Sequence, residues 1–271
     1  MSGPIANARM YAVTPEAEAR WQALLGHVAE DAGVTFTYEA YPAPRPLEKL
    51  WSRSDLGAVF MCGYPIALKL ADVTPIAAPI PDASWAEGRA VYRSDLIVRA
   101  GSPFQTLADT FGGRLGWTVE HSHSGFNALR HHLLKFRTPE RPKLYGAVIG
   151  NLVTARRVLD EVLAGTIDVG PLDAYWHRLI ARERPELVAG IRVIDATALA
   201  PVPAFVASGA APIEHVEALR EAFAQAHARS WFAELAEGLC ITGFKPVDHQ
   251  DFATTLAWDR EAKAAGYPIP A

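Results

Sequence analysis

A turn rich in serine and histidine lies near the middle of the chain, in Trp117-Thr-Val-Glu-His-Ser-His-Ser-Gly-Phe126. A helix is predicted to begin at this turn, because apolar residues on one helical face follow at steps of three and four: Phe126, Leu129, Leu133 and Phe136. A helix start carries unpaired backbone N–H groups and the positive end of the helix dipole, which suits a small anion. We therefore predict an anion site at Ser122, His123 and Ser124. The alternative is that Ser122 or Ser124 only caps the helix.

A carboxylate, Asp173, lies directly before another predicted helix, which carries apolar Leu179 and Ile180. Since a carboxylate and an oxyanion repel each other, Asp173 would have to face a protonated ligand oxygen or an amine. An aminoalkyl phosphonate or a monohydrogen phosphate-like group would meet this requirement. The alternative interpretation is that Asp173 simply caps its helix.

Four histidines near the turn raise the question of a metal site: His121, His123, His131 and His132. The first two lie on a turn, the other two point to different sides of a helix, and no cysteine or acidic set with ligand spacing accompanies them. We therefore expect no metal. A histidine with a pKa of about 6.5 would instead add positive charge to an anion site as the pH falls.

An enzyme is the competing class, because Ser122, His123 and Asp173 are the residue types used for acyl transfer. Adjacent serine and histidine side chains rarely reach the required geometry, and the chain has no Gly-x-Ser-x-Gly segment. It also has no P-loop and no dinucleotide-binding fingerprint. We therefore expect no catalytic residues and no cofactor.

The elements that position these residues alternate between strands and helices, which predicts an α/β fold with largely parallel sheets. Ala8–Ala12 is a strand candidate. Farther along the chain, Asn151 is expected to cap the helix that begins directly after Asn151.

Two stretches, near residues 91–100 and 193–205, are candidates for crossings between two lobes. They divide the chain into lobe one, residues 1–96 and 201–271, and lobe two, residues 97–200. Lobe one is then discontinuous in sequence, and lobe two is a single insert.

Composition narrows the possible functions. The chain has 271 residues, half of them hydrophobic, and a net charge of −4. It has no basic tract with interleaved aromatic residues and no apolar run near about 18 residues, so we expect no nucleic-acid partner and no membrane span. Cys62 and Cys240 lie far apart beside apolar residues, which favours two buried thiols, with one disulfide left open.

Residues 1–10 show no charged start followed by an apolar stretch, so they do not form a signal peptide. As written, the chain is expected in the cytoplasm. A leader trimmed from the sequence would place it in the periplasm.

Segments along nearly the whole chain resemble one family in their order and spacing. They are Arg9-Met-Tyr11 before the Thr14 helix, Met61-Cys-Gly-Tyr-Pro65, Val91-Tyr-Arg-Ser94, His121-Ser-His-Ser-Gly125, Val162–Asp173 followed by Tyr175-Trp176, and Pro201-Val-Pro203. In this order they resemble the phosphate, phosphite and phosphonate substrate-binding proteins of ABC transporters, the PhnD-like group with a type 2 periplasmic-binding fold.

The resemblance implies a two-lobed protein that closes on its ligand in a cleft between the lobes, with the ligand's anionic head on the serine turn. The positions carried over from the family's motifs are Tyr11, Tyr64, Tyr92, Ser122, His123, Ser124 and Asp173.

Two departures from the family's pattern leave the exact ligand open. Many relatives have Gly-Ser-His-x-x-Ser where this chain has Gly150-Asn-Leu-Val-Thr-Ala155, so that Asn151 and Thr154 are the nearest polar substitutes. In addition, His123 stands where a threonine or serine is common.

We therefore expect a substrate-binding protein for a small oxyanion such as phosphate, phosphite or a phosphonate, linked to ABC-type uptake through a permease partner. The alternatives are a cytoplasmic ligand sensor or a small-molecule enzyme, because the fold alone does not determine the function.

Overall fold

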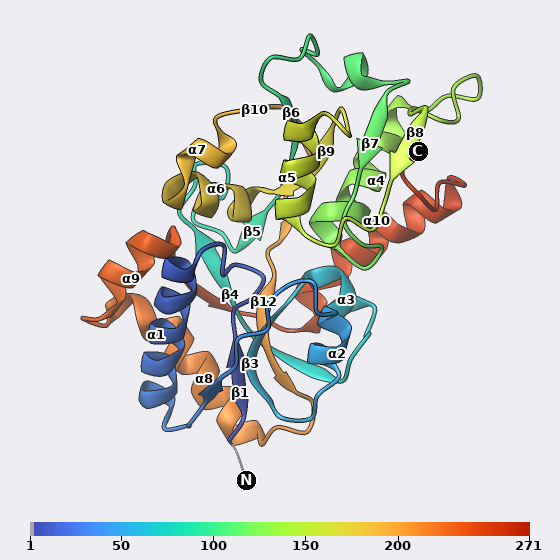
Figure 1. Cartoon of the computed structure of the whole chain (residues 1–271). Coiled ribbons are helices and arrows are strands. Elements are labelled where there is room, and N and C mark those ends of the chain that lie inside the picture. Colours follow the sequence, from blue (N-terminus) through green and yellow to red (C-terminus); the bar gives the residue numbers. More distant parts are fainter. Residues whose placement is uncertain (1–2) are drawn as a thin grey trace. The chain divides into compact units, whose positions relative to one another are not determined.

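The computed structural model describes residues 3–271. The chain forms two compact units, each built from strands and helices (Figure 1). Unit 1 holds the residues up to Tyr92 together with Pro201–Ala253, and unit 2 holds Arg93–Ala200 together with Thr254–Ala271. The predicted α/β class and the division into two lobes are confirmed.

Unit 1 is built around a six-stranded sheet with the order β13-β4-β12-β3-β1-β2. Its strands are β1 (Ile5–Asn7), β2 (Thr37–Tyr38), β3 (Leu56–Met61), β4 (Val73–Pro81), β12 (Ala204–Ser208) and β13 (Ile241–Pro246). β1 pairs in parallel with β2 and β3, whereas β12 runs antiparallel to β3 and β4, and β13 antiparallel to β4. The expectation of largely parallel sheets is wrong for this unit, because the chain that returns from unit 2 enters the sheet centre in the opposite direction.

The helices of unit 1 are α1 (Pro15–Ala32), α2 (Leu47–Trp51), α3 (Gly63–Ala67), α8 (Ile213–Gln225) and α9 (Phe232–Leu239), with 3-10 turns at Ala226–Ala228 and His249–Phe252. α1, α8 and α9 lie together on one side of the sheet (Figure 1). The Trp21 ring of α1 meets the Phe60 ring of β3 edge-on at 5.1 Å, and Phe205 of β12 stacks on Phe60. Aromatic pairs of this kind add to the stabilisation from burial alone.

Unit 2 contains a three-stranded antiparallel sheet with the order β10-β6-β9 and a parallel pair, β7 with β8. Its strands are β6 (Ser94–Arg99), β7 (Arg114–Gly116), β8 (Ala147–Ile149), β9 (Gly170–Asp173) and β10 (Ile191–Ala196). The short strands β5 (Val91–Tyr92) and β11 (Ala200–Pro201) mark two of the three points where the chain passes between the units. The third lies between Ala253 and Thr254.

The helices of unit 2 are α4 (Ala128–Leu133), α5 (Ala155–Ala164), α6 (Ala174–Glu183), α7 (Pro185–Val188) and most of α10 (Ala253–Ala264), with a π-helical turn at His123–Asn127 and 3-10 turns at Leu107–Thr110 and Leu134–Phe136. Phe126, Leu129 and Leu133, predicted to share a helical face, are all buried in one hydrophobic cluster of this unit.

Residues 254–271 belong to unit 2, whereas the sequence-based boundaries placed them in lobe one. Buried polar contacts explain this assignment. Arg130 Nη2 donates to Asp259 Oδ1 at 2.5 Å, and Arg130 Nη1 donates to the Pro268 carbonyl at 2.8 Å. These contacts join residues 129 and 138 positions apart, and no local sequence pattern announces them.

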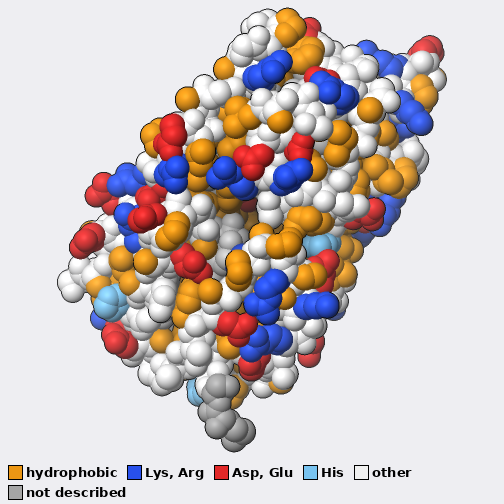
Figure 2. Space-filling model, viewed as in Figure 1, with side chains coloured by type: hydrophobic (Ala, Val, Ile, Leu, Met, Phe, Trp, Pro, Cys, Tyr) orange, Lys and Arg blue, Asp and Glu red, His pale blue; other side chains and the backbone are white. Residues whose placement is uncertain are grey.

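Cys62 and Cys240 are buried, and neither forms a disulfide. None of the helices among residues 3–271 is both long enough and apolar enough to cross a membrane. On the face drawn in Figure 2, basic and acidic side chains are interspersed, in keeping with the small net charge.

Candidate anion site

The serine turn occupies the start of a helical segment in unit 2. Ser122 is the N-cap of this segment, and its Oγ accepts a hydrogen bond from the Gly125 N–H at 3.0 Å. The predicted cap is therefore present. A hydroxyl has one donor and two acceptor positions. Capping uses one acceptor position, so the O–H can still donate to a ligand oxygen.

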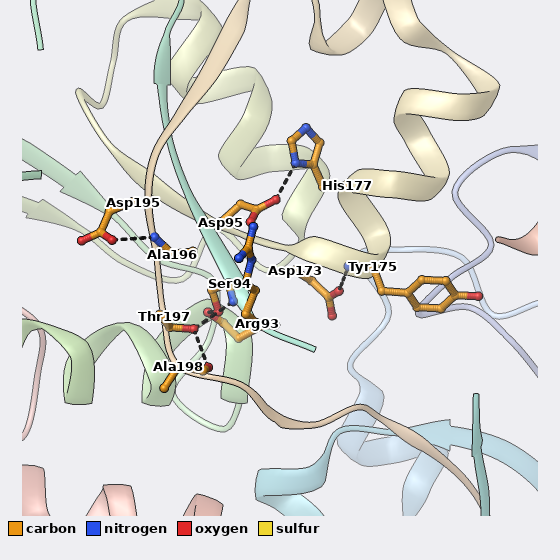
Figure 3. Close-up of polar contacts among 11 residues, drawn as sticks. Arg93, Ser94, Asp95, Asp173, Tyr175, His177, Asp195, Ala196, Thr197 and Ala198 are labelled. Atoms are coloured by element: carbon orange, nitrogen blue, oxygen red, sulfur yellow. Dashed lines mark hydrogen bonds and ion pairs between the residues drawn. The ribbon is translucent and has the colours of Figure 1, made fainter. Parts of the chain in front are cut away.

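Ser94 fixes the position of the turn relative to the central sheet of unit 2. Its Oγ donates to the Ser124 carbonyl at 2.8 Å, and its N–H donates to Thr197 Oγ1 at 2.9 Å. On the neighbouring strand β9, Asp173 is the residue paired with Ser94 (Figure 3). Ser94 therefore ties together two predicted site residues, Ser124 and Asp173. Sequence reasoning missed this role, and its only signal was the place of Ser94 in the Val-Tyr-Arg-Ser segment.

Asp173 ends β9 and caps α6. Its Oδ1 accepts hydrogen bonds from the N–H groups of Tyr175 at 2.9 Å and Trp176 at 3.0 Å. The side chain is largely buried, and Figure 3 shows it at the start of α6 beside Ser94. The capping interpretation accounts for Oδ1, and a ligand role for this carboxylate stays a prediction.

The His123 side chain is buried within unit 2. Its ring stacks on Trp258 of α10 at 5.2 Å, and its Nδ1 lies 3.3 Å from Asn127 Nδ2. Burial, and to a smaller degree the nearby His131, lowers the pKa of His123 to about 3. The expectation that a histidine of the turn gains charge as the pH falls through about 6.5 is therefore wrong for His123.

The loop that contains Asn151 lies against the strand end that leads into the serine turn. The Leu152 N–H donates to the Trp117 carbonyl at 3.2 Å, and the Val153 N–H donates to the Thr118 carbonyl at 3.3 Å. Asn151 has a φ of 56°, a left-handed conformation that asparagine tolerates better than most residues. The prediction that Asn151 caps the next helix is wrong, because the cap of α5 is Thr154, whose Oγ1 accepts from Arg157 N–H.

Thr118 packs directly under the serine turn. Its N–H donates to the Gly125 carbonyl at 3.2 Å. A Cβ on Gly125 would lie 1.9 Å from Thr118 Oγ1, so position 125 has no room for a side chain. No local signal in the sequence marks Thr118, because its close approach to the turn arises only in the fold.

The turn offers neutral donors and no formal positive charge. Residues 117–127 and 150–154 contain no lysine or arginine. Next to Ser94, the guanidinium of Arg93 donates to Asp95 at 3.2 Å, and His177 Nδ1 lies 2.9 Å from the same carboxylate (Figure 3). Hydroxyl and backbone N–H groups are thus the donors of the turn, and Glu120 adds a formal negative charge to the same stretch, which suits an anion of low charge.

The three predicted tyrosines belong to unit 1 and have buried rings. Tyr11 lies in the turn after β1, not in a strand as predicted, and its ring meets Phe60 edge-on at 5.0 Å. Tyr64 is part of α3, and the Tyr92 hydroxyl lies 3.7 Å from Cys62 Sγ. Their packing is that of core residues of unit 1, and their roles toward a ligand stay predictions.

The histidines of α4 pair separately. His131 Nε2 lies 2.7 Å from Glu261, and His132 Nε2 lies 2.8 Å from Asp195. Burial lowers the pKa of His132 in spite of this carboxylate. Within residues 3–271, no three histidine, cysteine or acidic side chains gather in an arrangement that would hold a metal ion.

Comparison with known proteins gives one family match. The profile of a family described as the periplasmic substrate-binding protein of phosphonate ABC transporters matches residues 12–252. No curated protein sequence matches the chain.

Solved structures share the fold over nearly the whole chain. A binding protein component of an ABC phosphonate transporter from Pseudomonas aeruginosa is 16% identical with a TM-score of 0.80, covering 98% of this chain and 88% of that one. PhnD1 from Prochlorococcus marinus, in complex with methylphosphonate, is 12% identical with a TM-score of 0.77, covering 97% and 98%. XAC2383 from Xanthomonas citri, bound to ATP, is 20% identical with a TM-score of 0.64, covering 98% of each.

Proposed function

The chain belongs to the family of periplasmic substrate-binding proteins of phosphonate ABC transporters, and we propose that it binds a small phosphonate or related oxyanion at the serine turn of unit 2. The family assignment confirms the resemblance found in the sequence motifs. The family consists of transport components, so the chain is a substrate-binding protein.

The observation that carries the proposed site is the construction of the turn. Ser122 caps the turn, and Ser94 donates a hydrogen bond to the Ser124 carbonyl from the central sheet of unit 2. Thr118 lies so close to Gly125 that no side chain fits at position 125. These features present hydroxyl and N–H donors on a rigid frame, which is the arrangement that lowers the cost of ordering a bound anion. Similarity to PhnD1, which was solved with methylphosphonate, supports a phosphonate as the ligand.

The absence of lysine and arginine from the turn and the neighbouring loop favours a monoanion over a dianion. Asp173 lies one strand away from Ser94, and a second negative charge there disfavours a fully ionised ligand. A phosphonate monoanion, or a phosphonate whose charge is balanced by an amine, therefore fits the serine turn better than the phosphate dianion.

The family match supports a proposal for the compartment and for delivery of the ligand. We propose that the protein works in the periplasm and hands its ligand to an ABC permease, with a cytoplasmic sensor as the alternative. Cell fractionation of the source organism decides between the two compartments. Loss of phosphonate uptake after deletion of the gene supports delivery to a permease, and unchanged uptake contradicts it.

Calorimetric titration tests the site. Phosphate, phosphite, methylphosphonate, 2-aminoethylphosphonate and ATP are titrated into the wild type, Ser124→Ala and Ser122→Ala. Loss of a hydroxyl that donates to a bound anion weakens binding by about ten- to a hundredfold. Loss of a cap alone lowers the free energy of unfolding by about 1 kcal/mol and leaves affinity intact.

The matched control is Ser208→Ala in unit 1. Ser208 Oγ accepts a hydrogen bond from Ala210 N–H, so this serine, like Ser122, accepts from a nearby backbone N–H. We expect the control to bind phosphonate like the wild type. Tight binding that survives both Ser122→Ala and Ser124→Ala would refute the proposed site, and turnover of an ester without oxyanion binding would favour an enzyme.

A further inference from the structure

The C-terminal helix α10 packs in unit 2 against the helical segment that the serine turn begins (Figure 1). This segment, the π-helical turn His123–Asn127 and α4, is called the serine helix below. Asn127 Nδ2 donates to the Thr255 carbonyl at 2.8 Å, and Arg130 Nη2 donates to Asp259 Oδ1. The side chains of Arg130 and Asp259 are only 2% and 6% exposed. A buried ion pair with additional hydrogen bonds holds one relative position of its two elements, because separating the charges in the interior is costly.

Trp258 of α10 stacks on two imidazole rings of the serine helix. Its ring stacks on His123 at 5.2 Å with an interplanar angle of 26°, and on His131 at 4.8 Å with an angle of 1°. His131 is further held by Glu261, at 2.7 Å. The two histidines are eight positions apart, so a single indole ring spans the first two turns of the helix.

His123 is the middle residue of the Ser-His-Ser turn. Because its side chain is fixed against Trp258, the peptide units on either side, which carry Ser122 and Ser124, are fixed with it. The His123 ring stays neutral at pH 7, since burial lowers its pKa to about 3. The contact between His123 and Trp258 is therefore a packing contact, and it does not depend on a charge on His123.

We propose that Trp258 is a positioning residue of the anion site, which holds His123 and thereby keeps the two serine hydroxyls in their ligand-binding arrangement. This inference rests on the proposed function. Trp258 lies outside the family match, which ends at residue 252. Preorganisation of this kind raises affinity because less ordering is needed when the ligand binds.

The test compares Trp258→Leu and Trp258→Phe in the full-length chain with Trp231→Leu. Trp231 is a matched control, because it stacks on one histidine, His27, at 4.9 Å in unit 1. Methylphosphonate and inorganic phosphate are titrated by calorimetry, and Tm is measured for each variant.

We expect Trp258→Leu to weaken the binding of both anions by about tenfold or more, and Trp258→Phe, which keeps an aromatic ring, to stay within roughly threefold of the wild type. Trp231→Leu should lower Tm without changing affinity. Wild-type affinity in a folded Trp258→Leu protein overturns the proposal. If that variant does not fold, Trp258→Met, which keeps apolar volume without the ring stack, takes its place.

Hydrogen exchange gives a readout that needs no ligand. Amides of residues 122–127 should exchange faster in Trp258→Leu than in Trp231→Leu at the same temperature, because the turn loses its support. Unchanged exchange in this segment contradicts the proposal even if no oxyanion binds. Failure of the wild type to bind any oxyanion, with faster exchange in the variant, would instead refute the proposed function and leave the positioning role standing.

Discussion

Replacing Asp173 with asparagine separates its capping role from a role toward the ligand. Asp173 Oδ1 accepts hydrogen bonds from two N–H groups of α6, at 2.9 and 3.0 Å. Asparagine keeps a carbonyl oxygen for these bonds and is as good a cap as aspartate. The favourable interaction of the charge with the helix dipole is lost, which amounts to about 0.3–1 kcal/mol. The Asp173→Asn protein should therefore be nearly as stable as the wild type.

The effect on binding depends on the ligand. If the carboxylate faces an amine, its removal should weaken 2-aminoethylphosphonate by about ten- to a hundredfold, the value of a charge-assisted hydrogen bond. Binding of phosphate should strengthen, because a repulsive negative charge has been removed. The two ligands thus change in opposite directions.

The assay is calorimetric titration of both ligands into the wild type, Asp173→Asn and the control Asp248→Asn. Asp248 is also a cap, since its Oδ1 accepts from Gln250 N–H at 2.7 Å, but it lies in unit 1. The control should leave both affinities unchanged. Equal affinities of wild type and Asp173→Asn for both ligands would refute a ligand role for Asp173 and leave the cap as its whole function.

Two further predictions concern stability. Gly125→Ala would place a Cβ 1.9 Å from Thr118 Oγ1, so it should lower the free energy of unfolding in urea by about 1–3 kcal/mol. The control Gly26→Ala, in α1, has nothing within 4 Å of the added Cβ and should raise this free energy by about 0.5–1 kcal/mol. Equal effects of the two substitutions would contradict the close packing of the turn. The lowered pKa of His123, about 3, means that only the unfolded chain takes up this proton between about pH 6.5 and 3. The contribution of His123 to stability should therefore fall by about 1.4 kcal/mol per pH unit as the pH drops through that range. His123→Phe, which keeps an aromatic ring, should flatten this slope in denaturation curves at several pH values, and an unchanged slope would show that His123 does not contribute.

Local signals in the sequence predicted the parts of the fold that depend on neighbouring residues. Thr14 Oγ1 accepts from Ala17 N–H at the start of α1, and Asp173 caps α6, as their positions indicated. The apolar face that includes Leu129 and Leu133 is buried as its spacing predicted. Caps and helical faces are decided within one or two turns of chain, so the sequence shows them directly.

Contacts between distant segments could not be predicted in the same way. The pairing of Ser94 with Asp173 and the ion pair of Arg130 with Asp259 join segments that are far apart in sequence. An isolated side chain of this kind is not part of a periodic pattern in the sequence. Its partner is determined by the tertiary fold. The prediction that Asn151 caps the next helix was wrong for a related reason. Backbone N–H groups of the Asn151 loop donate to the strand end at Trp117 and Thr118, and this distant contact sets the conformation of the loop.

The central claim is that a phosphonate binds at the serine turn of unit 2. A crystal structure with methylphosphonate tests it most directly. We predict the phosphonate oxygens within hydrogen-bond distance, about 2.5–3.2 Å, of the hydroxyls of Ser122 and Ser124 and of backbone N–H groups of the turn. A phosphonate bound elsewhere in the protein, with both serine hydroxyls out of its reach, would contradict the account.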